Sequence, residues 1–204
     1  MIDHAGVMEA GRKEKGGHFH AVRFYDNDVS LCRIVAGFLR EGFALGQPGV
    51  VIATKAHAQG IVAELRAREL YVTELVASND LVIADADDVL ASFMVDGQPN
   101  AEKFFSTANA TLDRARRGRT NVTIRTYGET VDVLWKEGRD VAAIQLEILW
   151  NRLARESDFS LLCGYATASF VENVGVNDVC RQHTHLLYPD GTARVSNIDT
   201  LLVD

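Results

Sequence analysis

Short apolar runs alternate with longer amphipathic stretches along most of the chain from His18 onward. The short runs carry apolar residues almost without interruption, which is typical of parallel strands buried on both faces. Two more short runs flank a Pro-Asp-Gly turn near the C-terminus, the pattern of a hairpin. The predicted strands cover residues 20–25, 50–54, 81–84, 122–126, 159–164, 185–188 and 192–195.

Between these runs, apolar residues recur every three or four positions, which predicts helices with one buried face. The first helix follows Asp26-Asn27-Asp28, residues suited to capping a helix start. Further helices are predicted over 56–69, 86–94, 100–117, around Leu134 and Trp135, and over 141–156 and 174–183. The alternation of strand and helix predicts an α/β fold: a three-layer sandwich with a mostly parallel central sheet and a C-terminal hairpin.

Length and charge narrow this picture. The 204 residues, 47% of them apolar, suit one domain, which we place at residues 18–189, after a flexible lead-in (1–17) and before a turn, edge strand and tail (190–204). The net charge of −7 disfavours a nucleic-acid partner. No apolar run is long enough for a membrane span or signal peptide, which predicts a cytoplasmic protein without membrane contact. Three widely spaced cysteines do not resemble a disulfide framework.

Ligands of such sheets usually bind at the carboxyl ends of the strands. The first strand leads into Tyr25-Asp-Asn-Asp-Val-Ser-Leu31, which has no glycine and no lysine and carries two carboxylates. A nucleotide hydrolase needs a glycine-rich loop and a lysine at this point to hold phosphates. The sequence therefore argues against ATP hydrolysis, although nucleotide binding without hydrolysis stays open.

Two acidic residues stand out. Glu129 follows the fourth strand, and Glu147 lies among Ile144, Leu146, Ile148, Leu149 and Trp150, in a helix that is apolar almost all round. A buried carboxylate needs a partner. Arg125 or Arg152 is the structural candidate; alternatively, Glu129 and Glu147 line a ligand pocket. Cys163 and Tyr165 end the fifth strand, where Cys163 either packs as a small apolar residue or lies beside the pocket mouth.

Histidine and cysteine pairs near both ends of the predicted domain have the spacing of metal ligands. His18 and His20 share one face of an extended segment, as do His183 and His185, and Cys180 precedes His183 in a Cys-x-x-His pattern. The two groups are far apart in the chain, so capping or core roles remain the alternative to a metal site.

The run Arg114-Ala-Arg-Arg-Gly-Arg119 is the only basic cluster. It falls at a predicted helix end, where arginine side chains interact favourably with the helix dipole. We interpret it as a solvated helix terminus and not as a nucleic-acid site.

Five segments, taken in order, resemble the DcmR-like sensory domain, also called the MEDS domain. They are His20-Ala-Val-Arg-Phe-Tyr25, Arg125-Thr-Tyr-Gly-Glu129, Ala143-Ile-Gln-Leu-Glu-Ile-Leu-Trp-Asn151, Leu161-Leu-Cys-Gly-Tyr165 and Cys180-Arg-Gln-His-Thr-His185. The resemblance implies a RecA- or KaiC-like fold without a phosphate loop. It also implies a non-enzymatic sensory role in bacterial signal transduction, with hydrocarbon derivatives as proposed ligands.

The expected function follows from this resemblance. A small molecule, or a partner protein such as a histidine kinase, is expected in a strand-end cleft bordered by Tyr25, Glu129, Cys163 and Tyr165, with the helix around Glu147 responding. His20 completes the set of candidate ligand-binding residues. The alternatives are a metal- or redox-responsive protein using His18, His20, Cys180, His183 and His185, and a degenerate nucleotide binder; homo-oligomerisation and the cofactor stay open.

Overall fold

The computed structural model describes residues 19–170, 175–188 and 192–195. His18, the predicted lead-in and most of the predicted tail lie outside these ranges.

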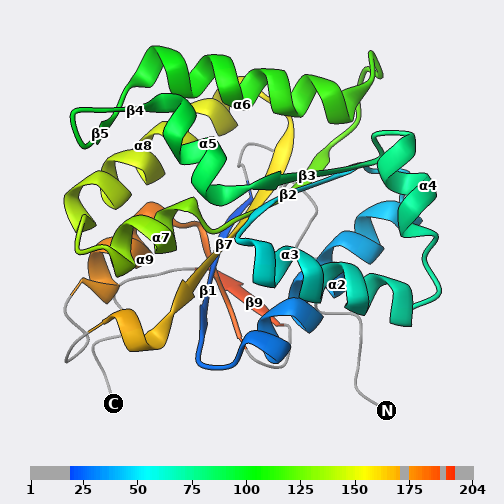
Figure 1. Cartoon of the computed structure of the whole chain (residues 1–204), viewed down its shortest axis with the longest axis horizontal. Coiled ribbons are helices and arrows are strands. Elements are labelled where there is room, and N and C mark those ends of the chain that lie inside the picture. Colours follow the sequence, from blue (N-terminus) through cyan, green and yellow to red (C-terminus); the bar gives the residue numbers. More distant parts are fainter. Residues whose placement is uncertain (1–18, 171–174, 189–191, 196–204) are drawn as a thin grey trace.

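Seven strands form one sheet in the order β3-β2-β6-β7-β1-β8-β9 (Figure 1). All neighbours pair in parallel except β8 and β9, which form the antiparallel C-terminal pair. The strands are β1 (His20–Tyr25), β2 (Gly49–Ala53), β3 (Leu81–Asp85), β6 (Ile124–Gly128), β7 (Phe159–Ala166), β8 (His185–Leu187) and β9 (Ala193–Val195). Every residue of β2 and β6 is buried, as continuous apolar runs require in a sheet covered on both faces.

Helices cover both faces of this sheet, which confirms the predicted α/β sandwich (Figure 1). One face carries α2 (Asp28–Ala44), α3 (Lys55–Ala67) and α4 (Val72–Ala77). The opposite face carries α5 (Ala86–Phe93), α6 (Ala101–Arg116), α7 (Thr130–Lys136), α8 (Asp140–Glu156) and α9 (Val176–Gln182). The short hairpin β4 (Met94–Val95) and β5 (Gln98–Pro99) joins α5 to α6, and a 3₁₀ turn, η1 (Thr167–Ser169), follows β7.

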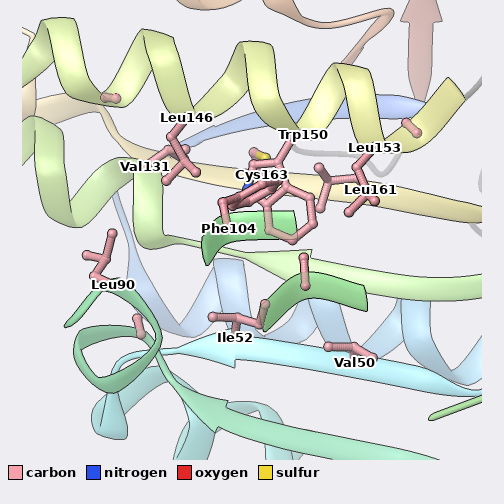
Figure 2. Packing of buried hydrophobic residues seen from close by; sticks show 14 of the residues in the cluster. Val50, Ile52, Leu90, Phe104, Val131, Leu146, Trp150, Leu153, Leu161 and Cys163 are labelled. Atoms are coloured by element: carbon pink, nitrogen blue, oxygen red, sulfur yellow. The ribbon is translucent and has the colours of Figure 1, made fainter. Parts of the chain in front are cut away.

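Each face of the sheet has its own hydrophobic core. Under α5 to α9, the Phe104 ring meets the Trp150 ring edge to face at 4.9 Å, above strand residues such as Val50, Ile52 and Leu161 (Figure 2). Burying an aromatic ring of this size stabilises the fold by about 2–3 kcal/mol. Successive side chains along each strand point alternately into the two cores, so the position of a residue in its strand, odd or even, decides which core its side chain joins.

The predicted helix starts and strand positions are largely confirmed. Asn27 caps α2, since its side chain accepts from the Ser30 backbone N–H at 3.0 Å. The basic run also behaves as a helix terminus: Arg119 donates to the backbone carbonyls of Ala115 and Arg116, and its guanidinium lies 2.9 Å from Asp80. Among the described helices, none is long and apolar enough to cross a membrane.

Candidate functional site

Polar side chains gather near the carboxyl half of the sheet in two separate clusters, one on each face. The open cluster, next to α2 and α3, contains Tyr25, Asp28, His57, Glu129 and Asp132. The closed cluster, beneath α8, contains His20, Glu147, Cys163, Tyr165 and His183. Each is described in turn.

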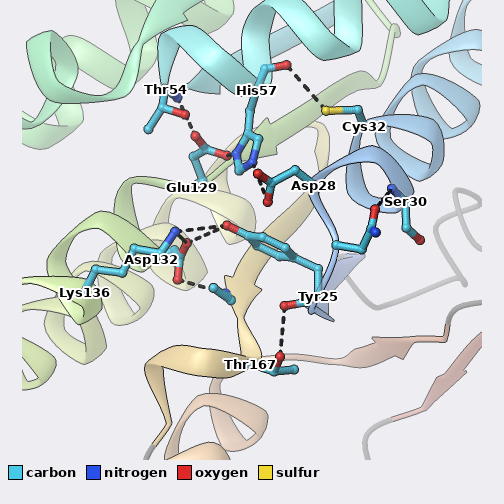
Figure 3. Close-up of polar contacts among 12 residues, drawn as sticks. Tyr25, Asp28, Ser30, Cys32, Thr54, His57, Glu129, Asp132, Lys136 and Thr167 are labelled. Carbon is cyan, nitrogen blue, oxygen red and sulfur yellow. Dashed lines mark hydrogen bonds and ion pairs between the residues drawn. The ribbon is translucent and has the colours of Figure 1, made fainter.

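Glu129 is the centre of the open cluster. It follows β6 directly, immediately precedes α7 and is 1% exposed. Its carboxylate accepts hydrogen bonds from the Thr54 backbone N–H and from His57 Nδ1 at 2.6 Å (Figure 3). It also accepts a hydrogen bond from the Tyr127 hydroxyl at 2.8 Å. Three donors to one carboxylate compensate for its loss of water.

His57 bridges this buried carboxylate to the surface. It lies in the first turn of α3, and its Nε2 is 3.3 Å from Oδ1 of Asp28, whose side chain is 75% exposed (Figure 3). The hydrogen bond to Glu129 raises the pKa of His57 against the opposing effect of burial. Burial raises the pKa of Glu129, but His57 outweighs it and the pKa falls below its ordinary value. The pair is therefore held in its charged form.

Tyr25 and Asp132 extend the open cluster towards the end of β7. The Tyr25 hydroxyl donates to Asp132 Oδ2 at 2.9 Å, and the Ala166 backbone N–H donates to Oδ1 at 2.9 Å. Lys136 Nζ lies 2.7 Å from Oδ2 and forms the cationic partner of this carboxylate, which is 2% exposed (Figure 3). Burial and Asp132 raise the pKa of Tyr25, so the phenol stays protonated.

A pocket of about 260 Å³ opens beside this cluster, between α2 and α3. Its lining combines small apolar residues with His57 and two carboxylates: Asp28, Val29, Cys32, Ala56, His57, Gly60, Ala63 and Glu64. The volume is just below the usual range for ligand sites and suits a small molecule.

The closed cluster draws its side chains from four parts of the chain. His20 Nε2 lies 3.3 Å from Glu147 Oε2 and 3.4 Å from Cys163 Sγ, while His183 Nε2 lies 3.4 Å from Glu147 Oε1. The Tyr165 hydroxyl donates to Glu147 Oε1 at 2.8 Å. His20 and Glu147 are 0% exposed, Cys163 1% and His183 5%, so water has no access to the group.

Burial dominates the protonation of these groups. It raises the pKa of the Cys163 thiol and of the Tyr165 phenol, with Glu147 adding to both effects. It lowers the pKa of His183 to about 4, so this imidazole is neutral near pH 7. Burial raises the pKa of Glu147, whereas a proton on His183 or on His20 and the hydrogen bond from the Tyr165 hydroxyl lower it, and the net shift is downward.

The sheet separates side chains that the sequence predicts in one cleft. Tyr25 and Glu129 lie on the α2–α3 face, whereas His20, Cys163 and Tyr165 lie on the other, because their positions have opposite parity in the parallel register. Cys163 packs in the core beneath α8 and does not border a pocket mouth (Figure 2). The expectation of one shared cleft is therefore wrong.

The predicted arginine partners of Glu147 are also wrong. Arg125 lies on the α2 face, where it donates to Gln47 at 2.8 Å and its guanidinium covers the Phe38 ring. Arg152 is exposed and approaches Glu156. Glu147 instead contacts imidazoles and the Tyr165 phenol, because it faces the sheet at the level of β1 and β7.

The predicted metal ligands are brought together in part. His20 and His183 meet, with ring centroids 4.2 Å apart, and join Glu147 and Cys163 in a group whose ligand atoms lie within 4.8 Å of one another. Cys180 is buried nearby but is not a member, and His185 hydrogen-bonds Thr184 and packs against Phe19. His18 lies outside the described residues.

His57 and Asp132 are site residues that the sequence does not single out. His57 comes four positions after the end of β2, in the first helical turn, where a strand-end ligand is within reach. Asp132 comes four positions after β6 on the same principle. The signal available in the sequence was the position of each residue in the first turn of the helix that follows a strand.

The seven-residue helix α7 contacts both clusters. Glu129 directly precedes it, Asp132 in its first turn accepts from Tyr25, and Trp135 in its last turn packs edge to face on Tyr165 at 6.0 Å. Tyr165 in turn donates to Glu147. A shift of α7 therefore disturbs both clusters together.

Comparison with known proteins identifies the chain's relatives. The family model described as "MEthanogen/methylotroph, DcmR Sensory domain" (MEDS) matches residues 19–184. Among solved structures, the fold is similar to a KaiC-like protein from the hyperthermophilic archaeon Pyrococcus horikoshii OT3, with a TM-score of 0.58 and 13% identity over 84% of this chain and 74% of that one. This likeness concerns the fold alone. A search of curated protein sequences finds no match.

Proposed function

We propose that this chain, which belongs to the MEDS sensory-domain family, detects a small molecule in the pocket between α2 and α3. The family supports a sensory role. The site, the chemical class of the ligand and the route to a partner are the proposal.

One observation carries it: the pocket is the place where a buried charged pair reaches the surface. His57 lines the pocket, and its other ring nitrogen holds Glu129 at 2.6 Å. A ligand that hydrogen-bonds to His57 or displaces Asp28 from it changes the environment of Glu129, the residue immediately before α7. Binding in the pocket can therefore alter the sheet end, which a sensor requires.

The lining favours a small, largely apolar ligand with one polar group. Val29, Ala56, Gly60 and Ala63 form apolar walls, while His57 supplies the buried hydrogen-bonding group. Asp28 and Glu64 at the rim favour an alcohol or amine over an acid. This agrees with a hydrocarbon-derived ligand, and a pocket of about 260 Å³ has room for roughly ten heavy atoms.

The signal then needs a protein partner such as a histidine kinase. The acidic chain, with its net charge of −7, suits protein contacts better than contacts with nucleic acid. α7 is the candidate output element because it contacts both clusters. A ligand shifts the partner's activity only as far as it prefers one position of α7 to another.

Thermal denaturation with three matched probes tests the ligand class. Ligands that bind only the folded protein raise its Tm by mass action. We expect 1-propanol and n-propylamine to raise the Tm and propionate to leave it unchanged. If none of the three moves the Tm up to the highest concentration that a control protein tolerates, the proposal fails.

A matched pair of variants in α3 tests the location. Ala63→Leu adds an isopropyl group to a side chain that lines the pocket, whereas Ala67→Leu makes the same change one turn later, outside the lining. Ala63→Leu is expected to abolish the Tm shift of the probes and Ala67→Leu to retain it. Equal responses of both variants would place the ligand elsewhere.

A further inference from the structure

The closed cluster has more hydrogen-bond acceptors than donors. His20 is one of the acceptors, because its ring hydrogen is used outside the cluster. Its Nδ1 lies 2.9 Å from Asn151 Oδ1. The Asn151 amide nitrogen donates to the Gln182 carbonyl at 2.8 Å, so the oxygen of that amide must face His20. His20 therefore donates through Nδ1, and in the neutral ring Nε2 presents a lone pair to Glu147 and Cys163.

His183 has the same orientation. Its Nδ1 lies 2.7 Å from the Val179 carbonyl, which can only accept, so the ring hydrogen is on Nδ1. Its Nε2 is buried and, within the described part of the chain, receives no hydrogen bond. That nitrogen faces Glu147 Oε1 at 3.4 Å, lone pair against carboxylate.

Four acceptor atoms, two imidazole nitrogens and two carboxylate oxygens, thus face one another with only two hydrogens, those of Tyr165 and Cys163. A buried acceptor without a donor costs about 1–3 kcal/mol, and an ionised carboxylate without a cation costs more. No lysine or arginine among the described residues forms an ion pair with Glu147. A cation at the centre of the group would satisfy these acceptors.

The spacing of the four side chains matches metal coordination better than hydrogen bonding. In a tetrahedral zinc site with bonds of about 2.0–2.3 Å, neighbouring ligand atoms lie about 3.3–3.6 Å apart. The nitrogen–oxygen and nitrogen–sulfur separations here are 3.3, 3.4 and 3.4 Å. All four ligand atoms lie within 4.8 Å of one another, so small side-chain rotations close the tetrahedron.

We propose that His20, Glu147, Cys163 and His183 bind a divalent transition-metal ion, with zinc the best fit to two nitrogens, one oxygen and one sulfur. Binding forms four metal–ligand bonds and breaks the Cys163 S–H bond, releasing one proton to solvent. The Zn²⁺ charge is then balanced by one thiolate and one carboxylate, so the fully buried site is neutral. Asn151, Val179 and Tyr165 already orient the two imidazoles and the carboxylate, as supporting groups do around metals.

The site has a definite structural consequence, independent of the pocket on the other face. Its ligands come from β1, α8, β7 and the residue that follows α9. Since all four positions belong to protein side chains, no coordination site is open for catalysis. The ion instead ties the segment from α9 to β8 onto the sheet.

Metal content and cobalt spectroscopy of the full chain, prepared without a histidine tag, test the proposal. We expect about one zinc per chain after expression in zinc-supplemented medium. After removal of that zinc by a chelator, added Co²⁺ is expected to give the visible bands of tetrahedral cobalt and a near-ultraviolet thiolate-to-cobalt band, both saturating at one equivalent.

Two pairs of variants identify the ligands. Cys163→Ser is expected to abolish the thiolate-to-cobalt band, whereas Cys180→Ser, which changes the nearby cysteine outside the group, keeps it. His183→Gln is expected to weaken Co²⁺ binding at least tenfold, whereas His185→Gln leaves it unchanged. Circular dichroism tests whether each variant is folded. For a variant that is not folded, the cobalt spectrum of the wild-type chain alone decides whether the metal site exists.

The alternative to a metal ion is a proton that His20 and Glu147 share. In that case the wild-type protein carries less than a tenth of an equivalent of any transition metal and binds no Co²⁺, and the proposal is overturned. A cobalt spectrum without the thiolate band, or one that survives in folded Cys163→Ser, overturns it equally. Neither result bears on the probe experiments for the α2–α3 pocket.

Discussion

Both clusters pair histidine with glutamate, but one pair reaches solvent and the other does not, and this difference sets what each cluster can do. In the open cluster, His57 lies between Glu129 and the exposed Asp28, beside a pocket. In the closed cluster, His20 and His183 face Glu147 where every side chain is buried. A histidine–glutamate pair with access to solvent can be charged and respond to a solute. The same pair without access needs a permanent internal partner.

The largest expected effect is the loss of Glu147. Glu147→Ala removes the acceptor of the Tyr165 hydroxyl and leaves a cavity, so we expect a loss of about 3–5 kcal/mol in the free energy of unfolding. Urea denaturation measures it. Glu156→Ala, an exposed position on the same helix, is the control and is expected to change stability by less than about 0.5 kcal/mol. Similar losses in both variants would mean that burial of Glu147 does not distinguish the clusters.

Gly164 provides the next test, because it lies against Tyr127, whose hydroxyl belongs to the hydrogen bonds of Glu129. A Cβ at this position would lie 2.7 Å from the Tyr127 hydroxyl, which donates to Glu129. Gly164→Ala must displace that ring within the packed sheet, and we expect a loss of about 1–3 kcal/mol in urea denaturation.

Gly37→Ala is the matched control. No atom lies within 4 Å of a Cβ at this helical position, so the same substitution is expected to stabilise the protein by about 0.5–1 kcal/mol. A stabilised Gly164→Ala would show that Tyr127 moves freely and does not hold Glu129.

The pH dependence of stability should separate the clusters further, with an effect smaller than that of Gly164→Ala. The raised pKa of His57 contributes stability that is complete below its unfolded value of 6.5 and is lost as the pH rises through the folded pKa. The lowered pKa of Glu129 contributes stability above 4.5 that is lost as the pH falls through its folded pKa. The open cluster is thus most stabilising between these two values.

His57→Gln tests that assignment. Urea midpoints of the wild type should fall between pH 6.5 and pH 9, and His57→Gln should flatten this slope. His185→Gln is the control and should retain it. An unchanged slope in His57→Gln would assign the pH dependence to other groups.

Lys136 is expected to give the smallest effect. Its side chain is 48% exposed although its ammonium pairs with the buried Asp132 at 2.7 Å. Because Tyr25 and the Ala166 N–H still satisfy that carboxylate, Lys136→Met should cost only about 0.5–1 kcal/mol in urea denaturation. Arg152→Met, which breaks an exposed pair, should cost nothing measurable. A loss above about 2 kcal/mol in Lys136→Met would mean that Asp132 depends on this cation as a buried ion does.

Much of the fold was predictable because its strands are continuous apolar runs. The sequence predicts the first strand over the same residues that form β1, because the run from His20 to Tyr25 ends at the capping residues Asp26-Asn27-Asp28. The short α4 and the β4–β5 hairpin were missed because six or fewer residues carry too little periodicity.

The candidate site was predictable residue by residue but not as an arrangement. His20, Glu147, Cys163, Tyr165 and His183 were all singled out from residue type and position, and they meet. Their separation from Tyr25 and Glu129 depends on the register of β1 against β7 and β6, which sets the face of each side chain. Register arises from contacts between distant segments, so no local pattern contains it.

The helix α7 makes the two faces thermodynamically dependent on each other. It directly follows Glu129, which His57 holds, and its Trp135 packs on the tyrosine that holds Glu147. A solute in the pocket and an ion beneath α8 would then both act on the position of one rigid element. By linkage, whatever factor the ion applies to the affinity for the solute, the solute must apply to the affinity for the ion. The response of such a domain to either ligand would then depend on the concentration of the other.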